Sequence, residues 1–186
     1  MTAIEKAPTS IWRRILAYLV DYVLLFSVLV PLQGILYLVG RGFPYRLLRT
    51  GAQIELWVFL SISLPVWLYF ALAESSSRQA TLGKRLLGLR VTNLHGDRIG
   101  FGRAILRTII KLIPWELTHL SLMLPIPMWW DPQPRLRAGI VVVYAVIGIY
   151  LLAMFLNERR QSIHDLIAQT IVWIPAKENV KQGSSG

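Results

Sequence analysis

The sequence contains no cysteine among its 186 residues, which excludes disulfides and thiolate metal sites. Charge is also scarce, since only 16% of the residues are Asp, Glu, Lys or Arg, whereas 54% are hydrophobic. A soluble domain of this length carries more charge and fewer apolar residues. The composition therefore indicates a multi-pass membrane protein.

Acidic residues are few: 10 Asp and Glu stand against 20 Lys and Arg, which gives a net charge of +10. The basic residues cluster between and beside the apolar segments, as in cytoplasmic loops that face an anionic leaflet. We therefore expect membrane lipids as partners, anionic lipids among them, and no nucleic acid. The sequence shows no nucleophile with its base, no metal-ligand cluster and no cofactor loop, so we expect a protein that is not an enzyme and needs no cofactor.

Four apolar segments are long enough to cross ~30 Å of hydrocarbon as helices, at about residues 12–39, 54–74, 104–124 and 137–156. They predict an all-α membrane protein, a four-helix bundle within residues 11–175, with a small cytoplasmic β-element. The loop 75–103 and the tail 157–175 are predicted to be cytoplasmic. Residues 1–10 are predicted to be an N-terminal arm, and 176–186 a disordered tail whose closing Gly-Ser-Ser-Gly resembles a tag remnant.

The distribution of basic residues distinguishes two topologies. With four spans, 15 of the 20 basic residues lie on the inside and 5 on the outside. If residues 104–124 instead lie on the membrane surface, the split is 13 to 7. The surface alternative has support, because Arg103, Arg107 and Lys111 share one face of an amphipathic helix. The positive-inside rule favours four spans with both termini in the cytoplasm.

Asp21 lies inside the first span, where a carboxylate costs about 2.5–3.5 kcal/mol unless it is paired, neutral or facing water. Arg14, seven residues earlier, shares its helical face, but the two are roughly 10 Å apart along the axis and Arg14 leans away. We therefore expect the partners of Asp21 on other helices. Asp21 is either a protonatable ion-coupling group or a structural carboxylate, and Arg14 is either part of that site or a snorkelling interfacial anchor.

Glu116 and His119 share a face of the third span, which suits either a proton relay or a polar contact within the bundle. In the basic loop, Thr81 is expected to cap a short helical turn over LGKRLLG. Four basic residues in and after this loop are candidates for binding lipid or a protein partner, against the plainer interpretation of ordinary cytoplasmic charge: Lys84, Arg85, Arg103 and Arg107.

Residues 89–101 predict a β-hairpin about a His-Gly-Asp turn. In this hairpin Val91 and Leu94 would face Ile99 and Phe101. Two strands alone are marginal in water, so a third strand is expected to join them.

The tail supplies that strand, because residues 170–174 (TIVWI) have strand composition. Ser162 followed by Asp165 resembles a capping box that opens a short helix before it. Asp165 would then lie near Lys84 and Arg85, as a cap or clamp rather than an ion ligand.

Three stretches in this order resemble the RDD family of bacterial integral membrane proteins. RRILAYLVD supplies the arginine (Arg14) and aspartate (Asp21) of the first helix, and SRQATLGKRLLGLRVTNLHGDRIGFGRAILR resembles the T-L-G-K-R block with the segments that follow it. HDLIAQT resembles the H-D-x-x-A-x-T ending, which makes Asp165 the second aspartate. The resemblance covers residues 11–173, and Gln169 stands where a small residue, often glycine, is expected.

The resemblance implies two functions, because some members are assigned sodium–proton antiport and others look like membrane adaptors. The first hypothesis is a small proton-coupled monovalent cation transporter in which Asp21 changes protonation. Four helices leave little room for a pathway, so transport would need a homo-oligomer. The alternative is a non-catalytic scaffold that recruits a protein partner through its basic loop and tail.

Overall fold

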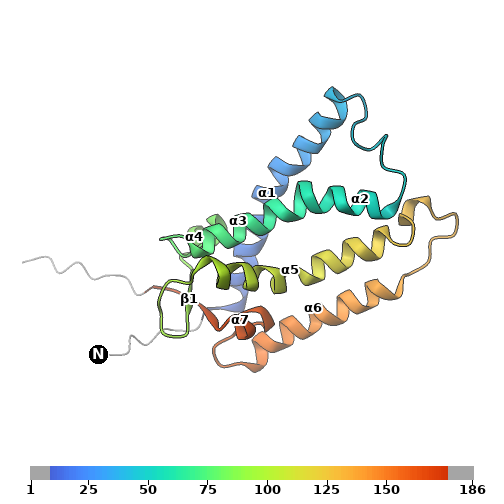
Figure 1. The fold of residues 1–186 in the computed structure, drawn as a ribbon. Helices are drawn as coiled ribbons and strands as arrows, with labels where there is room; N and C mark the ends of the chain where they lie inside the picture. Colours follow the sequence, from blue (N-terminus) through green and yellow to red (C-terminus); the bar gives the residue numbers. More distant parts are fainter. Residues whose placement is uncertain (1–8, 176–186) are drawn as a thin grey trace, which may run out of the picture.

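Four long helical segments lie side by side and form the body of the protein in the computed structural model, which describes residues 9–175 (Figure 1). They are α1 (Ile11–Val39), the continuous segment α2 (Gly51–Val58), η1 (Phe59–Ser63) and α3 (Leu64–Ser75), then α5 (Phe101–Met123) and α6 (Ala138–Leu156). All four are long and apolar enough to cross a membrane. The predicted four-helix architecture is confirmed to this extent, whereas the predicted tail 176–186 and most of the N-terminal arm lie outside the described residues.

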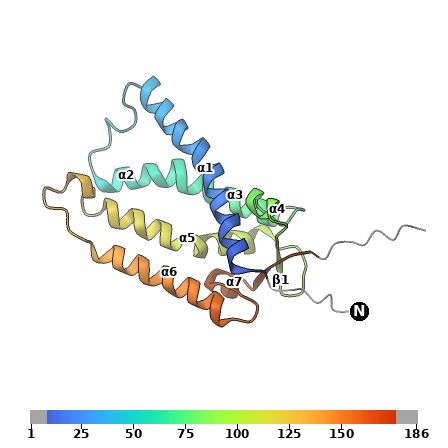
Figure 2. The same ribbon diagram turned by 180° about the vertical axis from the view of Figure 1, so that it is seen from behind.

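The third span is an integral part of the bundle. Helix α5 lies between α3 and α6 and runs along both of them, rather than across the end of the bundle (Figures 1 and 2). Its Pro114 is accommodated within a helix that continues to Met123. In the described chain, residues 104–124 pack within the bundle as part of one of the four long helices, as the four-span alternative requires.

Helix α1 crosses the other three at an angle, and its second half stands away from α2 (Figures 1 and 2). Side chains near its end are strongly exposed, including Leu38 at 74% and Val39 at 80%. One contact bridges the space, since Trp57 Nε1 donates to Gln33 Oε1 at 3.0 Å. In the second span, a π-helical turn, η1, precedes Pro65 and shifts the face that the following helix presents.

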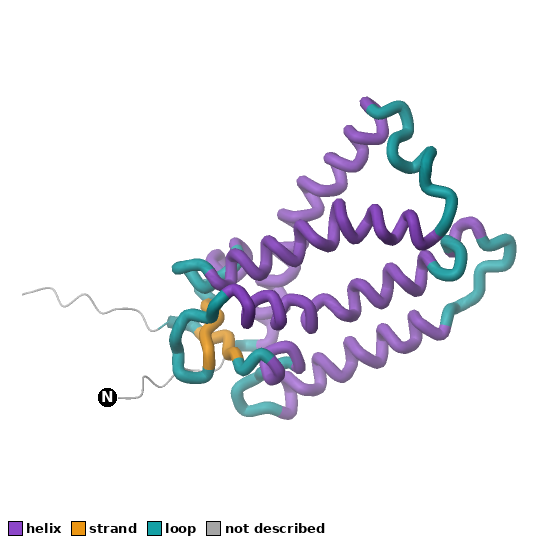
Figure 3. The backbone as a smooth tube through the Cα atoms, in the orientation of Figure 1, coloured by secondary structure: helices purple, strands orange, loops and turns teal. Residues whose placement is uncertain are grey.

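The short elements gather at one end of the bundle (Figure 3). They are α4 (Leu82–Leu86), β1 (Arg90–Asn93), α7 (Ile163–Ile167) and β2 (Thr170–Trp173), while a 3₁₀ turn, η2 (Met128–Trp130), lies in the loop at the opposite end. As predicted, Thr81 caps α4, and its Oγ1 accepts from Lys84 N at 3.3 Å. We refer below to this end as the sheet end.

The predicted hairpin is wrong, although the strand expected from the tail is present. Strand β2 pairs antiparallel with β1, with Val91 opposite Val172. Ile99 lies outside any strand and Phe101 opens α5. The reason is local: the Asn93 side chain accepts from the backbone N–H groups of residues 95 and 97, closing a turn, and β1 is left with β2 as its partner in the described chain.

The turn into β2 shows why a small residue, often glycine, is expected at the position of Gln169. Gln169 has φ of 51°, in the left-handed region that favours glycine. The small residue expected at this position would adopt that conformation at lower cost.

Two apolar clusters hold the fold together. One joins the sheet to the bundle and the other lies among α1, α3 and α5; their buried members are Ala17, Ala71, Leu89, Val91, Ile99, Ala104 and Val172, and Leu29, Val66, Phe70 and Leu112, respectively.

Candidate functional site

Asp21 is completely buried and its partners come from other elements, as expected. Its carboxylate accepts hydrogen bonds from Tyr69 Oη at 2.6 Å, Thr81 Oγ1 at 2.5 Å and Gly83 N at 2.8 Å. All three donors are neutral. Gly83 also lies so close to α1 that a Cβ atom would collide with the backbone carbonyl of Ala17. Asp21 therefore holds the α4 loop against the buried face of α1.

Arg14 pairs with the second aspartate of the family pattern and not with Asp21. Its guanidinium donates to the Asp165 carboxylate and to the Arg160 carbonyl. Both side chains are buried, at 9% and 0% exposure. Arg14 is therefore an ion-pair partner across more than half the chain, rather than a snorkelling anchor.

Asp165 also caps α7, as predicted, because it accepts from the backbone N–H of Ser162 at 3.3 Å. Lys84 and Arg85 were expected near Asp165, but its basic partners are Arg14 and Arg107. Burial alone would raise the pKa of the Asp165 carboxyl, but these two guanidinium groups outweigh burial and hold its pKa well below the usual value. Asp165 is therefore an anion in the folded protein.

Arg107 is the centre of a larger group of buried charges. Its guanidinium, 1% exposed, lies 2.5 Å from Glu74 Oε2 and 2.7 Å from Asp165 Oδ1. Lys84 Nζ lies 2.7 Å from Glu74 Oε1, and Lys111 Nζ lies 3.5 Å from the same oxygen. We call these six residues the ion cluster: Arg14, Glu74, Lys84, Arg107, Lys111 and Asp165.

The ion cluster places two of the candidate basic residues inside the protein. Lys84 and Arg107 are buried against acids and are absent from the outer surface, whereas Arg85 and Arg103 are exposed. The amphipathic α5 faces the opposite way from a surface helix. Arg107 points into the bundle, and Leu106, 44% exposed, points out of it. In a lipid environment this orientation buries charge and exposes hydrocarbon.

Glu74 is the member of the ion cluster that sequence reasoning missed. It ends the second span and is completely buried. The sequence did contain an indication of this role, because Glu74 is an acid at the end of a span and the most basic loop follows it, so several cations lie within reach. The sequence alone did not show which cation would turn inward.

A second polar group lies along α5 in the other half of the bundle. Glu116 and His119, predicted to share a face, are joined by Glu55 of α2, and one ligand atom from each lies within 4.8 Å of the others. Glu116 accepts from Ser63 Oγ at 3.2 Å and Trp67 Nε1 at 3.1 Å. We call these three residues the carboxylate–imidazole group: Glu55, Glu116 and His119.

Its polar atoms are only partly satisfied. Glu55 Oε2 and His119 Nδ1 are shielded from solvent and have no hydrogen-bond partner, and neither glutamate forms a salt bridge with a basic side chain in residues 9–175. The group can therefore accept protons or a cation. Glu55 was missed by sequence reasoning because it stands at the start of a span, where an acid is unremarkable.

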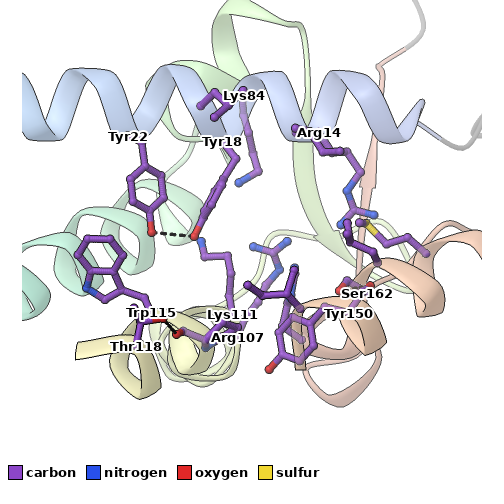
Figure 4. Close-up of a pocket in the computed structure, with 17 residues that line it drawn as sticks. Arg14, Tyr18, Tyr22, Lys84, Arg107, Lys111, Trp115, Thr118, Tyr150 and Ser162 are labelled. Carbon is purple, nitrogen blue, oxygen red and sulfur yellow. Dashed lines mark hydrogen bonds between the residues drawn. The ribbon is translucent and has the colours of Figure 1, made fainter. Parts of the chain in front are cut away.

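The two polar groups are distinct. Along α5, Lys111 and Glu116 are separated by five residues, or roughly 7.5 Å of helical rise. Figure 4 shows Lys111 and Arg107 directed from α5 toward α1, where Tyr18 and Arg14 lie. The Tyr18 and Tyr22 hydroxyls are 3.0 Å apart on the side toward Trp115.

Comparison with known proteins gives one family and one relative. The model of the RDD family matches residues 8–169. The uncharacterized protein YxaI of Bacillus subtilis (strain 168) is 32% identical over 132 residues, which cover 64% of this chain and 85% of that protein. No solved structure matches the chain significantly.

Proposed function

The chain belongs to the RDD family, and from this premise we propose that it is a multi-pass protein of the bacterial inner membrane that exchanges protons for a monovalent cation such as Na⁺. The observation that carries the proposal is the carboxylate–imidazole group, with two glutamates that lack basic partners in residues 9–175. The proposed coupling site is therefore Glu116 with Glu55 and His119.

Two carboxylates held close together inside a membrane are expected to bind either protons or a cation. If both were ionised with no cation nearby, their burial would be costly, so each must take up a proton or share a bound cation. Oxygen ligands of this kind suit hard cations. Since protons and the cation compete for the same oxygens, loading one releases the other, which is the elementary step of an exchanger.

The surrounding residues support this assignment. Ser63, which donates to Glu116, ends the π-helical turn η1, and such turns occur frequently at functional sites. A serine hydroxyl can reverse its role and accept a hydrogen bond when Glu116 is protonated. The neighbouring imidazole of His119 has a free Nδ1 that can receive the released proton.

Asp21 has a different role in this proposal from the one first expected. Its carboxylate already accepts three hydrogen bonds from neutral donors, and it holds the α4 loop in place. Asp21 is therefore assigned as a structural residue. Because four helices leave little room for a pathway, we include a homo-oligomer in the proposal.

An adaptor is the second candidate, and exposed charge favours it. Four arginines in and around the α4–β1 region are exposed at the sheet end, where a protein partner with acidic side chains could bind: Arg85, Arg90, Arg98 and Arg103.

The decisive test is cation-driven proton flux in proteoliposomes of the purified chain. We expect flux in the wild type, and its loss in Glu116→Gln and in Glu55→Gln, with Glu158→Gln as a matched control because Glu158 is exposed beyond α6. A folded wild type without flux would reject transport and leave the adaptor.

Orientation has its own test, because the chain contains no cysteine. We propose that both termini and the sheet end are cytoplasmic, following the positive-inside rule. In intact cells, Gln133→Cys in the loop between α5 and α6 should react with an impermeant thiol reagent, and His95→Cys in the β1–α5 turn should not. The reverse labelling pattern would show that the protein has the opposite orientation in the membrane.

A further inference from the structure

A cavity of about 410 Å³ lies between α1, α5, α6 and α7 at the sheet end (Figure 4). This volume falls within the ~300–1,000 Å³ typical of small-molecule sites. It is also far larger than the roughly 30 Å³ that one water molecule occupies in the liquid. The cavity is separate from the carboxylate–imidazole group, since none of its three residues lines it.

One part of the cavity wall is cationic. The ion cluster supplies four of the lining residues: Arg14, Lys84, Arg107 and Lys111. Glu74 and Asp165 are the acids that pair with these four cations. The cations therefore outnumber the acids paired with them, and the wall carries an excess of positive charge.

Lys111 makes the longest ionic contact of the four. Its Nζ lies 3.5 Å from Glu74 Oε1 and 3.3 Å from the centroid of the Phe70 ring. An ammonium group has three N–H donors, and beyond these two near contacts the Tyr18 ring lies 5.9 Å from Nζ. The Lys111 side chain is directed toward Tyr18 across the space between α5 and α1, so the third donor is available to an anion there.

The rest of the wall is mostly apolar and includes aromatic side chains, and its aliphatic part comes from two helices, α1 and α6. The aliphatic part includes Leu19, Ile147, Leu151 and Met154. Leu19 is 54% exposed and Leu151 is 38% exposed, so this part of the wall is continuous with the outer surface of the apolar helices. A ligand that satisfies both parts must be anionic at one end and a hydrocarbon at the other.

We propose that the cavity binds an anionic phospholipid, with the phosphate at Lys111 and an acyl chain between α1 and α6. Its level in the bundle agrees with this ligand. Arg14 lies in the first turn of α1, close to where the helix begins, and basic pockets between helices on the cytoplasmic side are known to suit anionic head groups. The lipid would connect two helices that the protein leaves apart.

The test is a binding titration of the full delipidated chain in neutral detergent, read by native mass spectrometry. The probes are phosphatidylglycerol and phosphatidylcholine with identical acyl chains, and inorganic phosphate. We expect phosphatidylglycerol to bind at least about tenfold more tightly than phosphatidylcholine, because both carry the phosphodiester but phosphatidylcholine adds a quaternary ammonium that the cationic wall repels. Inorganic phosphate alone should not displace it.

Two pairs of variants separate the head group from the chain. Lys111→Gln should remove the preference for phosphatidylglycerol, while Arg103→Gln, the same change at an exposed position of α5, should not. Leu151→Trp should fill the aliphatic part and weaken both lipids, whereas Leu152→Trp, which points away from the cavity lining, should leave them unchanged. Leu151→Trp alters no charge, so it stays decisive even if Lys111→Gln fails to fold.

Two results would overturn the proposal. Equal affinity for the two lipids would show that the cavity does not select an anionic head group. Displacement by inorganic phosphate, together with full binding in Leu151→Trp, would make this a site for a free anion. The outcome is independent of transport, because Glu116→Gln should abolish flux and leave lipid binding intact.

Discussion

At the sheet end, the buried carboxylates of Asp21, Glu74 and Asp165 are all held by several donors, whereas at the α2–α5 contact Glu55 leaves one oxygen unpartnered. At the sheet end, the buried charges join α1, α3, α5 and α7. At the α2–α5 contact, the glutamates have no basic partners in residues 9–175. Since cations and several hydrogen-bond donors both favour the charged form of a carboxylate, the difference separates carboxylates that hold the fold together from carboxylates that remain free to bind a proton or a cation.

The largest expected effect comes from removing the centre of the ion cluster. Arg107→Met leaves Glu74 and Asp165 as buried acids without their shared partner, and breaking a buried pair costs about 3–5 kcal/mol. We expect little monodisperse protein after extraction and a much lower unfolding temperature. Arg103→Met is the control on the same helix. Equal stability of the two variants would contradict a structural role for the ion cluster.

The next effect should be confined to the tail. Asp165→Asn keeps the size of the side chain but loses its ionic pairing with Arg14 and Arg107, a loss of about 1–3 kcal/mol. Limited proteolysis should then cleave within residues 160–175, which the wild type protects. Asp97→Asn, an exposed acid in the β1–α5 turn, should leave the cleavage pattern unchanged. Protection of the tail in Asp165→Asn would mean that β-pairing alone holds it.

Much of this fold is predictable from sequence because each feature has a local cause. The four spans follow from apolar length, the α4 turn from the cap at Thr81, and the strand at the tail from its β-branched residues. The partner of that strand is less predictable. Asn93 closes a turn with its own side chain, and this local contact replaces the hairpin that the alternating pattern suggested.

The site was harder to predict because the residues of each pair are far apart in the chain. Arg14 and Asp165 were recognised separately, but the bond between them spans 151 positions and depends on how α7 folds under α1. Arg107 points into the bundle and Leu106 points out of it, which is the reverse of a soluble amphipathic helix and the orientation that a lipid environment would favour. Glu55 becomes notable only when α2 and α5 bring it to Glu116 and His119.

A smaller effect should appear as a pH dependence at the sheet end. Burial, together with the nearby guanidinium groups of Arg107 and Arg14, lowers the pKa of His164 well below its ordinary value, against the attraction of Asp165. The unfolded chain takes up a proton near pH 6.5 while the folded protein does not. The resulting stability is therefore complete above that pH and decreases below it, by at most about 1.4 kcal/mol per pH unit.

This dependence can be isolated from that of Asp165. The pKa of Asp165 is lowered too, but its contribution is lost only as the pH falls below its unfolded value of about 3.9. Between pH 7.5 and pH 5 the contribution of Asp165 is constant, so the difference in thermal stability between the wild type and His164→Gln should report His164, with the shallower profile in His164→Gln. His95→Gln, an exposed histidine in the same half of the protein, should keep the wild-type slope. An unchanged slope in His164→Gln would assign the dependence to another group.

The smallest expected change in stability is at the carboxylate–imidazole group, although the functional effect there is complete. In Glu116→Gln the amide oxygen can accept from Trp67 Nε1, and the amide nitrogen can donate to Ser63 Oγ, because a hydroxyl can serve as donor or acceptor. No salt bridge is broken, so the free energy of unfolding should stay within about 1 kcal/mol of the wild type. The measurement is the contrast with Arg107→Met: each variant removes one charged side chain from α5, and only the loss of Arg107 should prevent stable folding. A collapse of Glu116→Gln comparable to that of Arg107→Met would mean that Glu116 is also a structural acid, and the distinction between the two ends would fail.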